Sequence, residues 1–206
     1  MLLGIDTCGG AGSIALAQRT SDGLALIAEA EIAGKTYSAL LVPKIRELLE
    51  ANRRGPQDLE SVVIVNGPGS FTGIRVGLST AKGLAEALHI SLVAVSRLAV
   101  LARNAASDAA ALDAGRGEFY FRLHEDEALL TPAEIRDRFS GSFAVCEESA
   151  AAAFPDAILI PPPTAADALH YALPRIVAKD FDDLATVDGN YVRRSDAELF
   201  AHQAKH

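Results

Sequence analysis

The sequence predicts an α/β protein made of two related domains with mixed sheets, residues 1–105 and 106–206. Two patterns carry this prediction. Apolar runs of strand length alternate with helical patterns in the first half of the chain, as in parallel strand–helix–strand units. Two apolar strands, about a hundred residues apart, each end in an aspartate before a glycine-containing turn. With 206 residues, 50% of them hydrophobic, the chain has enough apolar material for a core.

The first domain is expected to begin with three strands at 2–5, 13–17 and 24–32, joined by turns that contain glycine. A helix is predicted over 37–53, because apolar residues recur there every three or four positions. The apolar runs 61–65 and 91–95 are typical of buried parallel strands. Between them, Ser70 is a natural cap for a helix over 71–88. A short helix over 96–105 ends the domain.

The second domain is predicted from weaker patterns. A strand pair is expected at 109–112 and 118–123, followed by helices over 132–139 and 165–179. Short strands are expected near 143–146 and 157–160, and the three prolines at 161–163 indicate a rigid linker.

Composition and charge exclude several classes of function. Lys and Arg number 19 against 27 Asp and Glu, a net charge of −8, so the chain alone is a poor binder of nucleic acid. Two cysteines do not make a disulfide framework. No apolar run approaches the roughly 20 residues that span a bilayer. We therefore expect a cytoplasmic protein with no membrane contact.

Asp6 and Asp113 end the two similar apolar strands. Each precedes a turn whose backbone N–H groups can bind an anion, although an aspartate often does no more than start a turn. Found twice, the arrangement is the layout of the actin-like ATPase fold (ASKHA, ribonuclease H-like), in which two related domains clamp a nucleotide. No P-loop or G-x-G-x-x-G match follows a strand, so we interpret the two aspartates as vestiges of a nucleotide site and expect no cofactor.

The helix expected over 71–88 carries a stripe of small residues, Gly73, Gly77, Ala81 and Ala85. Each glycine inside a helix costs about 1 kcal/mol relative to alanine, so a close approach to this stripe is indicated. The stripe packs either on the chain's own sheet or on another subunit. The opposing stripe is also small and weakly polar, which predicts that a second subunit covers one of the two faces. It consists of Val76, Thr80, Gly83 and Ala87.

Five segments of the chain resemble the TsaB family, also called YeaZ. They are Gly4–Thr7, Asn66–Gly77, Ala81–Ala85, Asp113–Tyr120 and Tyr191–Glu198. The resemblance is dense over 1–120 and returns near the end of the chain. Its most specific part is the motif loop and the helix start that follows it, with Gly67, Pro68, Gly69, Ser70, Thr72 and Arg75.

The resemblance implies an accessory protein of bacterial tRNA threonylcarbamoyladenosine synthesis. Family members are inactive relatives of TsaD, a metal-dependent transferase, which they bind and activate together with the ATPase TsaE. It follows that tRNA is contacted only through the complex, and that the isolated chain forms a homodimer through the same helices. The implied partner-binding residues are Tyr37, Leu40, Leu41, Ile45, Phe71, Gly73, Ile74, Gly77, Leu78, Ala81 and Ala85.

The same comparison implies no catalytic residue and no metal ligand in this chain. Arg97 and Leu101 stand where the transferase has two metal-binding histidines, and neither is a usual metal ligand. Two residues depart from the family pattern: Gly115 stands where Arg is frequent and Tyr37 where His is frequent. Two alternative functions stay open, a small-molecule kinase or ATPase of the actin-like fold and a structural homodimer without chemistry. Affinity of the isolated chain for Mg-ATP would favour the first.

Overall fold

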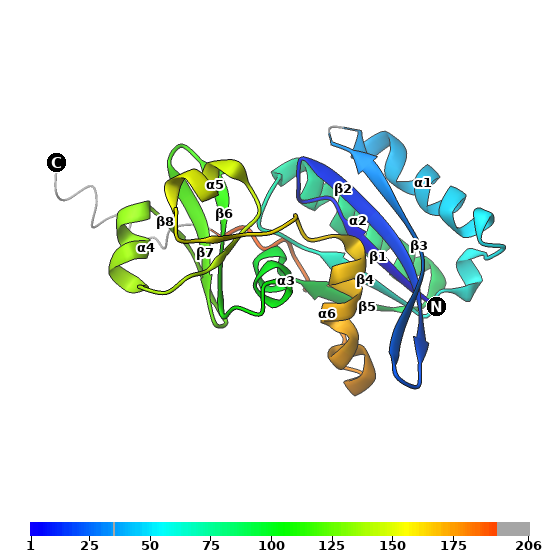
Figure 1. The fold of residues 1–206 in the computed structure, drawn as a ribbon. Helices are drawn as coiled ribbons and strands as arrows, with labels where there is room; N and C mark the ends of the chain where they lie inside the picture. Colours follow the sequence, from blue (N-terminus) through cyan, green and yellow to red (C-terminus); the bar gives the residue numbers. More distant parts are fainter. Residues whose placement is uncertain (35, 193–206) are drawn as a thin grey trace.

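Two five-stranded mixed sheets form the framework of the protein. The computed structural model describes residues 1–34 and 36–192 (Figure 1). The first repeat comprises β1 (Leu2–Asp6), β2 (Ala11–Thr20), β3 (Gly23–Ala33), α1 (Tyr37–Ala51), β4 (Ser61–Val65), α2 (Phe71–Leu88), β5 (Ser91–Val95) and α3 (Arg97–Asn104). The second comprises β6 (Ala109–Gly115), β7 (Glu118–Leu123), β8 (Asp126–Leu130), α4 (Pro132–Arg138), β9 (Ala144–Val145), α5 (Glu148–Ala153), β10 (Ile158–Leu159) and α6 (Ala165–Ala178).

The two sheets have the same topology. Read in the same direction, the strand order is β3-β2-β1-β4-β5 in one and β8-β7-β6-β9-β10 in the other. In each sheet the first three strands pair antiparallel and the last two join in parallel. This repeat confirms the prediction of two related mixed-sheet domains with the actin-like, ribonuclease H-like fold.

Local sequence explains where several helices begin. The Ser70 hydroxyl accepts a hydrogen bond from the Gly73 N–H at 3.2 Å and caps α2, as expected. Thr131 and Thr164 each form a capping box with the carboxylate three residues later, and these boxes begin α4 and α6.

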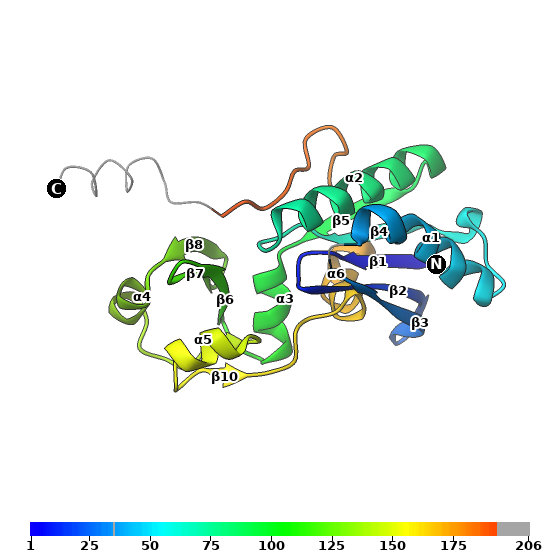
Figure 2. The same ribbon diagram turned by 90° about the horizontal axis from the view of Figure 1, so that it is seen from above.

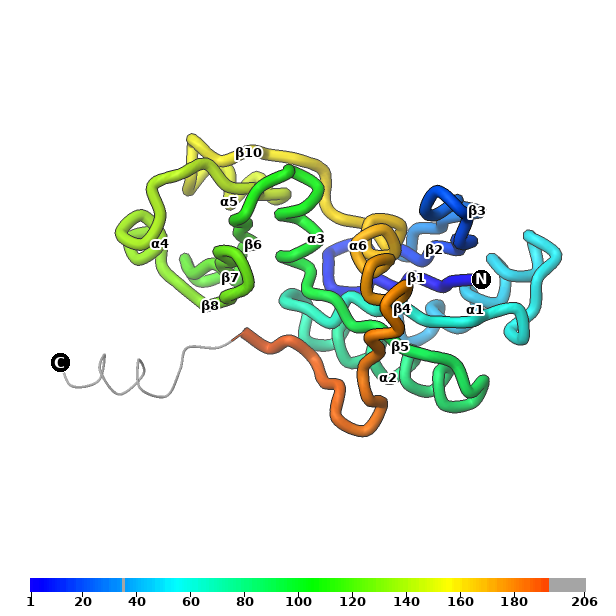
Figure 3. The backbone as a smooth tube through the Cα atoms, turned by 90° about the horizontal axis from the view of Figure 1, so that it is seen from below, coloured from blue at the N-terminus to red at the C-terminus, as the bar shows by residue number. Residues whose placement is uncertain are grey.

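The first sheet is covered on both faces, as Figures 1 and 3 show. Leu3 of β1 packs with Leu41 of α1 and Leu78 of α2 in one core cluster, whereas Leu2 packs with Leu169 of α6 in another. Successive residues of a strand point to opposite faces, so a wholly buried strand such as β1 serves both cores. A Cβ at Gly4 would lie 2.6 Å from the Ala165 carbonyl oxygen, so only glycine lets α6 approach β1 this closely.

The last helix of each repeat packs on the sheet of the other repeat. Leu98 and Leu101 of α3 pack against Ala110 and Leu112 of β6, whereas α6 packs on β1. Figure 2 shows α3 between the two sheets. The predicted second domain, 106–206, therefore needs correction. Its sheet spans Ala109–Leu159, but α6 belongs to the core of the first domain.

The segment after α6 also returns to the first domain. The Asp182 N–H donates to the Leu92 carbonyl at 3.0 Å, and Lys82 of α2 donates to the Val187 carbonyl at 3.1 Å. The segment then reaches the motif loop, where the Asn190 N–H donates to the Asn66 carbonyl at 2.7 Å. Residues 193–198 of the C-terminal signature lie outside the described residues. None of the helices within 1–34 and 36–192 combines the length and the hydrophobicity that spanning a bilayer requires.

Candidate functional site

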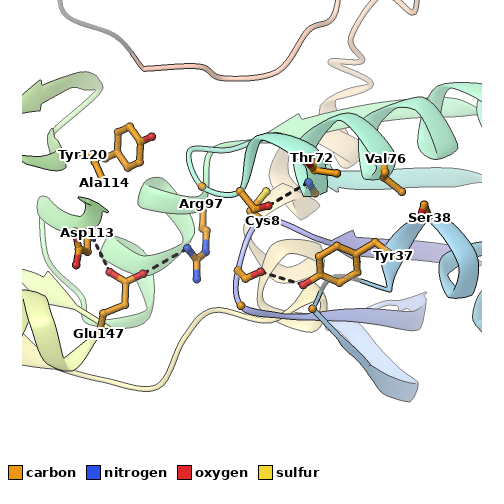
Figure 4. Close-up of a pocket in the computed structure, with 16 residues that line it drawn as sticks. Cys8, Tyr37, Ser38, Thr72, Val76, Arg97, Asp113, Ala114, Tyr120 and Glu147 are labelled. Atoms are coloured by element: carbon orange, nitrogen blue, oxygen red, sulfur yellow. Dashed lines mark hydrogen bonds and ion pairs between the residues drawn. The ribbon is translucent and has the colours of Figure 1, made fainter. Parts of the chain in front are cut away.

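A cavity of about 580 Å³ lies between the two domains (Figure 4). The β1–β2 turn and the first turns of α1 and α2 line it from one side. Asp113, Tyr120 and Glu147 line it from the second domain, and Arg97 lies at the junction. The sequence analysis predicts vestiges of a nucleotide site in this position, between the two domains.

Asp6 and Asp113 have the same local role in the two repeats. Asp6 accepts a hydrogen bond from the Cys8 N–H at 2.8 Å, and Asp113 accepts one from the Gly115 N–H at 2.6 Å. Each carboxylate thus stabilises its own turn by accepting a hydrogen bond from the backbone N–H two residues further along the chain. Asp6 is 3% exposed, and burial raises its pKa, although the nearby Arg97 guanidinium acts in the opposite direction. Asp113 lines the cavity, whereas Asp6 does not.

The motif loop holds the β1–β2 turn and the C-terminal segment together. Gly69 has a φ of +153° and lies against Cys8, and the Ser70 N–H donates to the Cys8 carbonyl at 2.8 Å. At Gly67, whose φ is +121°, a Cβ would lie 2.6 Å from the Asn190 carbonyl oxygen. Glycine is needed at both positions for backbone conformation and for close approach. The sequence pattern marks this loop but does not reveal that it receives the C-terminal segment.

The stripe of small residues on α2 packs on the chain's own sheet. The Thr7 hydroxyl donates to the Gly73 carbonyl at 2.7 Å, and Gly77 lies against the Thr7 side chain and Ile64. Ala81 and Ala85 are buried in the same core. The expectation that this stripe contacts a partner is wrong, because the β1–β2 turn and β4 already occupy that side of the helix. Added bulk at Gly77 or Ala81 would disturb the fold itself.

Most of the residues predicted to bind a partner are interior. Of that set, only Leu40 and Phe71 are strongly exposed, at 39% and 46%. The other nine are buried within the chain: Tyr37, Leu41, Ile45, Gly73, Ile74, Gly77, Leu78, Ala81 and Ala85. Tyr37 donates a hydrogen bond to the Gly9 carbonyl at 3.0 Å and so helps close the cavity.

The outward side of α2 carries the second stripe of small residues, opposite Gly73 and Gly77 on the helix, and α1 lies beside it. Val76 and Thr80 are half-buried, Gly83 and Ala87 are exposed, and Val42 of α1 is 49% exposed. We call these five residues the helix-pair surface. Ser38 and Val76 both line the cavity, so the two helices meet at its mouth. The surface is small-sided, weakly polar and open.

An aromatic cluster lies beside this surface at the start of α2. The Arg75 guanidinium stacks 3.8 Å from the centre of the Phe71 ring, and the Tyr191 ring lies 5.3 Å from that of Phe71. Arg75 is exposed and makes no ion pair with any residue in the described part of the chain. The C-terminal segment thus completes a site that begins 120 residues earlier in the chain.

Comparisons with known proteins agree with this fold. A model of the family described as "TsaD: tRNA N6-adenosine threonylcarbamoyltransferase" matches residues 29–185. The tRNA threonylcarbamoyladenosine biosynthesis protein TsaB of Bacillus subtilis is 39% identical over 95 residues, 44% of this chain and 42% of the relative. The protein of the same name from Escherichia coli is 30% identical over 154 residues, 66% of this chain and 65% of the relative. The chain thus spans less than two thirds of the length of either relative.

A solved structure titled YeaZ from Pseudomonas aeruginosa superposes with a TM-score of 0.73 at 23% identity. The match covers 93% of this chain and 99% of that one, and it supports the fold. The family model covers well over half of the chain, and the curated relatives named TsaB agree with it. The chain therefore belongs to the TsaD-related family that this model describes, and within that family it groups with the TsaB (YeaZ) proteins.

Proposed function

We propose that this chain is an accessory subunit that activates a TsaD-type transferase in the threonylcarbamoylation of tRNA, without catalysing the transfer itself. Family membership, together with relatives named TsaB, carries the proposal. The matching family model is described by the name of the transferase itself, and we propose that this chain lacks the transferase's catalytic activity. The comparisons do not favour the alternative kinase or ATPase, because the curated relatives are named for tRNA modification.

The helix-pair surface is the part of the chain that we assign to the transferase. It lies on two long neighbouring helices and offers small or apolar side chains that let another helix approach closely. The cluster of Phe71, Arg75 and Tyr191 adds an aromatic anchor with an unpaired cation, the residue types that dominate binding energy at protein interfaces. A partner carboxylate placed against Arg75 fits this anchor.

Further partners follow from this assignment. The net charge of −8 supports contact with tRNA only through the complex, in which we also place a TsaE-type ATPase. A second copy of the chain would use the same surface, so the homodimer and the transferase complex exclude each other.

Reconstitution of the reaction tests the proposal. Purified TsaC-, TsaD- and TsaE-type proteins are incubated with ATP, threonine, bicarbonate and unmodified tRNA, with and without this chain, and the modified nucleoside is quantified by mass spectrometry. We expect product only when the chain is present. Equal product without it would contradict an activating role.

Variants of the helix-pair surface test its place in the complex. Gly83→Arg and Phe71→Ala should each weaken binding to the transferase at least about tenfold, or ~1.4 kcal/mol. The matched control is Val177→Arg on α6, because Val177 is 63% exposed on the opposite side of the sheet. Binding is measured by calorimetry. Loss of affinity in the control, or unchanged affinity in both surface variants, would place the interface elsewhere.

A further inference from the structure

Arg97 is a buried cation at the junction of the two domains. It is the first residue of α3 and is 6% exposed. Its N–H donates to the Gly67 carbonyl at 2.6 Å, and its guanidinium lies against Gly9, where a Cβ would be 3.0 Å from Nη2. The helix that follows packs on the second sheet. The side chain therefore lies against the first domain, while Leu98 and Leu101 of its helix pack on the second sheet.

The charges around Arg97 come from both domains. Nη1 lies 3.7 Å from Oε1 of Glu147, which precedes α5 in the second domain. The other oxygen of Glu147 accepts the Asp113 N–H at 2.7 Å, so its position is fixed. From the first domain the buried carboxylate of Asp6 acts on the same guanidinium. Burial alone would lower the pKa of Arg97, but these negative groups, Asp6 foremost, raise it.

The hydrogen bonding of Arg97 is incomplete. Its Nε is buried and has no hydrogen-bond partner among the described residues. Burying a cation is strongly unfavourable unless opposite charges compensate it. The compensation here is mainly electrostatic and depends on two carboxylates that belong to different domains. Separation of the domains would part Arg97 from one of these two carboxylates.

The preceding residue makes a second bridge. The Ser96 hydroxyl, which also caps α3, donates to Oε1 of Glu127 on β8. Glu127 is only 10% exposed and also accepts hydrogen bonds from Arg122 at 2.8 Å and from Asn190 at 2.6 Å. Two consecutive residues, 96 and 97, thus join the domains through two different carboxylates.

We propose that Arg97 is a permanent internal counter-ion that holds the two domains closed in the absence of any ligand. In a two-domain cleft, closure usually depends on a molecule that contacts both sides. Here a side chain of the protein itself contacts both sides. The proposal concerns the chain alone, so it stands or falls independently of the proposed partner.

The distance between the domains tests this role. Nitroxide labels are placed on Asp22→Cys in the β2–β3 turn and Glu125→Cys in the β7–β8 turn, both exposed, and the distance distribution is measured by pulsed electron paramagnetic resonance. The labelled protein with Arg97 intact should give one narrow distribution of label-to-label distances, and Mg-ATP should not change it. A shift towards shorter distances on addition of Mg-ATP would overturn the proposal, because closure would then need a ligand.

Substitutions separate the charge of Arg97 from its bulk. Arg97→Met keeps the length of the side chain and should broaden the distribution towards longer distances, whereas Arg97→Lys should stay close to the parent. The control is Asn104→Met at the end of the same helix, an exposed residue. A parent-like distribution in Arg97→Met would overturn the proposal.

Glu147→Gln provides a second route if Arg97→Met does not fold. The side chain of Glu147 is 30% exposed, and the amide oxygen can still accept the Asp113 N–H, so the variant keeps local structure while removing the charge. It should also broaden the distribution, and less than additively when combined with Arg97→Met. A narrow, unshifted distribution in Glu147→Gln would contradict the proposal.

Discussion

The same substitution at two glycines of α2 should have opposite effects on stability. Gly73 and Gly83 belong to one helix, and alanine is the better helix former by about 1 kcal/mol at either position. At Gly83 nothing lies within 4 Å of an added Cβ, so Gly83→Ala should gain this full amount. For a chain of this size that corresponds to a rise in Tm of about 2–4 °C.

At Gly73 the added methyl group meets the backbone. A Cβ there would lie 3.1 Å from the Thr7 carbonyl carbon and would overlap its oxygen. Overpacking of this kind costs about 1–3 kcal/mol. The hydrogen bond from the Thr7 hydroxyl to the Gly73 carbonyl would be strained too, a loss of about 1 kcal/mol that cancels the gain in helix propensity. Gly73→Ala should therefore lower the free energy of unfolding by about 1–3 kcal/mol.

Urea unfolding followed by far-UV circular dichroism measures both variants against the parent. The midpoint should move up for Gly83→Ala and down for Gly73→Ala, with unchanged slopes. A gain in stability at both positions would refute the packing of the stripe on the β1–β2 turn and would return it to an outward position.

Two predictions concern buried ionisable groups. Burial raises the pKa of Cys8 well above its ordinary value and that of Cys146 to about 11. Both thiols should therefore react slowly with a disulfide reagent at pH 8 and rapidly after unfolding. Fast labelling of the native chain would contradict their burial. Burial first, then the negative charge of Asp6, raises the pKa of Tyr37 from 10.0 to about 12, and the unfolded chain therefore loses this proton first. The stability that Tyr37 contributes is fully present below pH 10 and is lost as the pH rises through 12. In urea unfolding between pH 9 and 12, Tyr37→Phe should remove the part of the stability loss that comes from Tyr37. An identical pH profile of stability in both proteins would refute this prediction.

The duplicated fold could be predicted because its signal is local. An apolar strand that ends in Asp6 or Asp113 before a turn is visible in a few residues, and the structure gives both aspartates the same hydrogen bond. The partner of α6 is not a local property. Its apolar face fits any apolar sheet face, so the pattern over 165–179 could not reveal that it covers β1.

The two faces of α2 show a second limit. Both stripes are small, so periodicity identifies the faces without telling which one is interior. Thr7 decides this through its contacts with Gly73 and Gly77, which join residues more than sixty positions apart. Arg97 gave one usable signal, a charged residue directly after a buried strand and a cap. Its carboxylate from the second domain, Glu147, lies fifty residues further along the chain.

The exchange of last helices between the repeats has a consequence for biosynthesis. A ribosome completes the first sheet at Val95, yet the helix that covers one of its faces is made only with residues 165–178. Until then Leu2, Val63 and Val93, all buried in the finished protein, have no cover from α6. The nascent first domain thus exposes an apolar face for as long as the second domain is being translated, a situation that favours association with chaperones. Folding of the first domain is therefore completed only after residues 165–178 have been made.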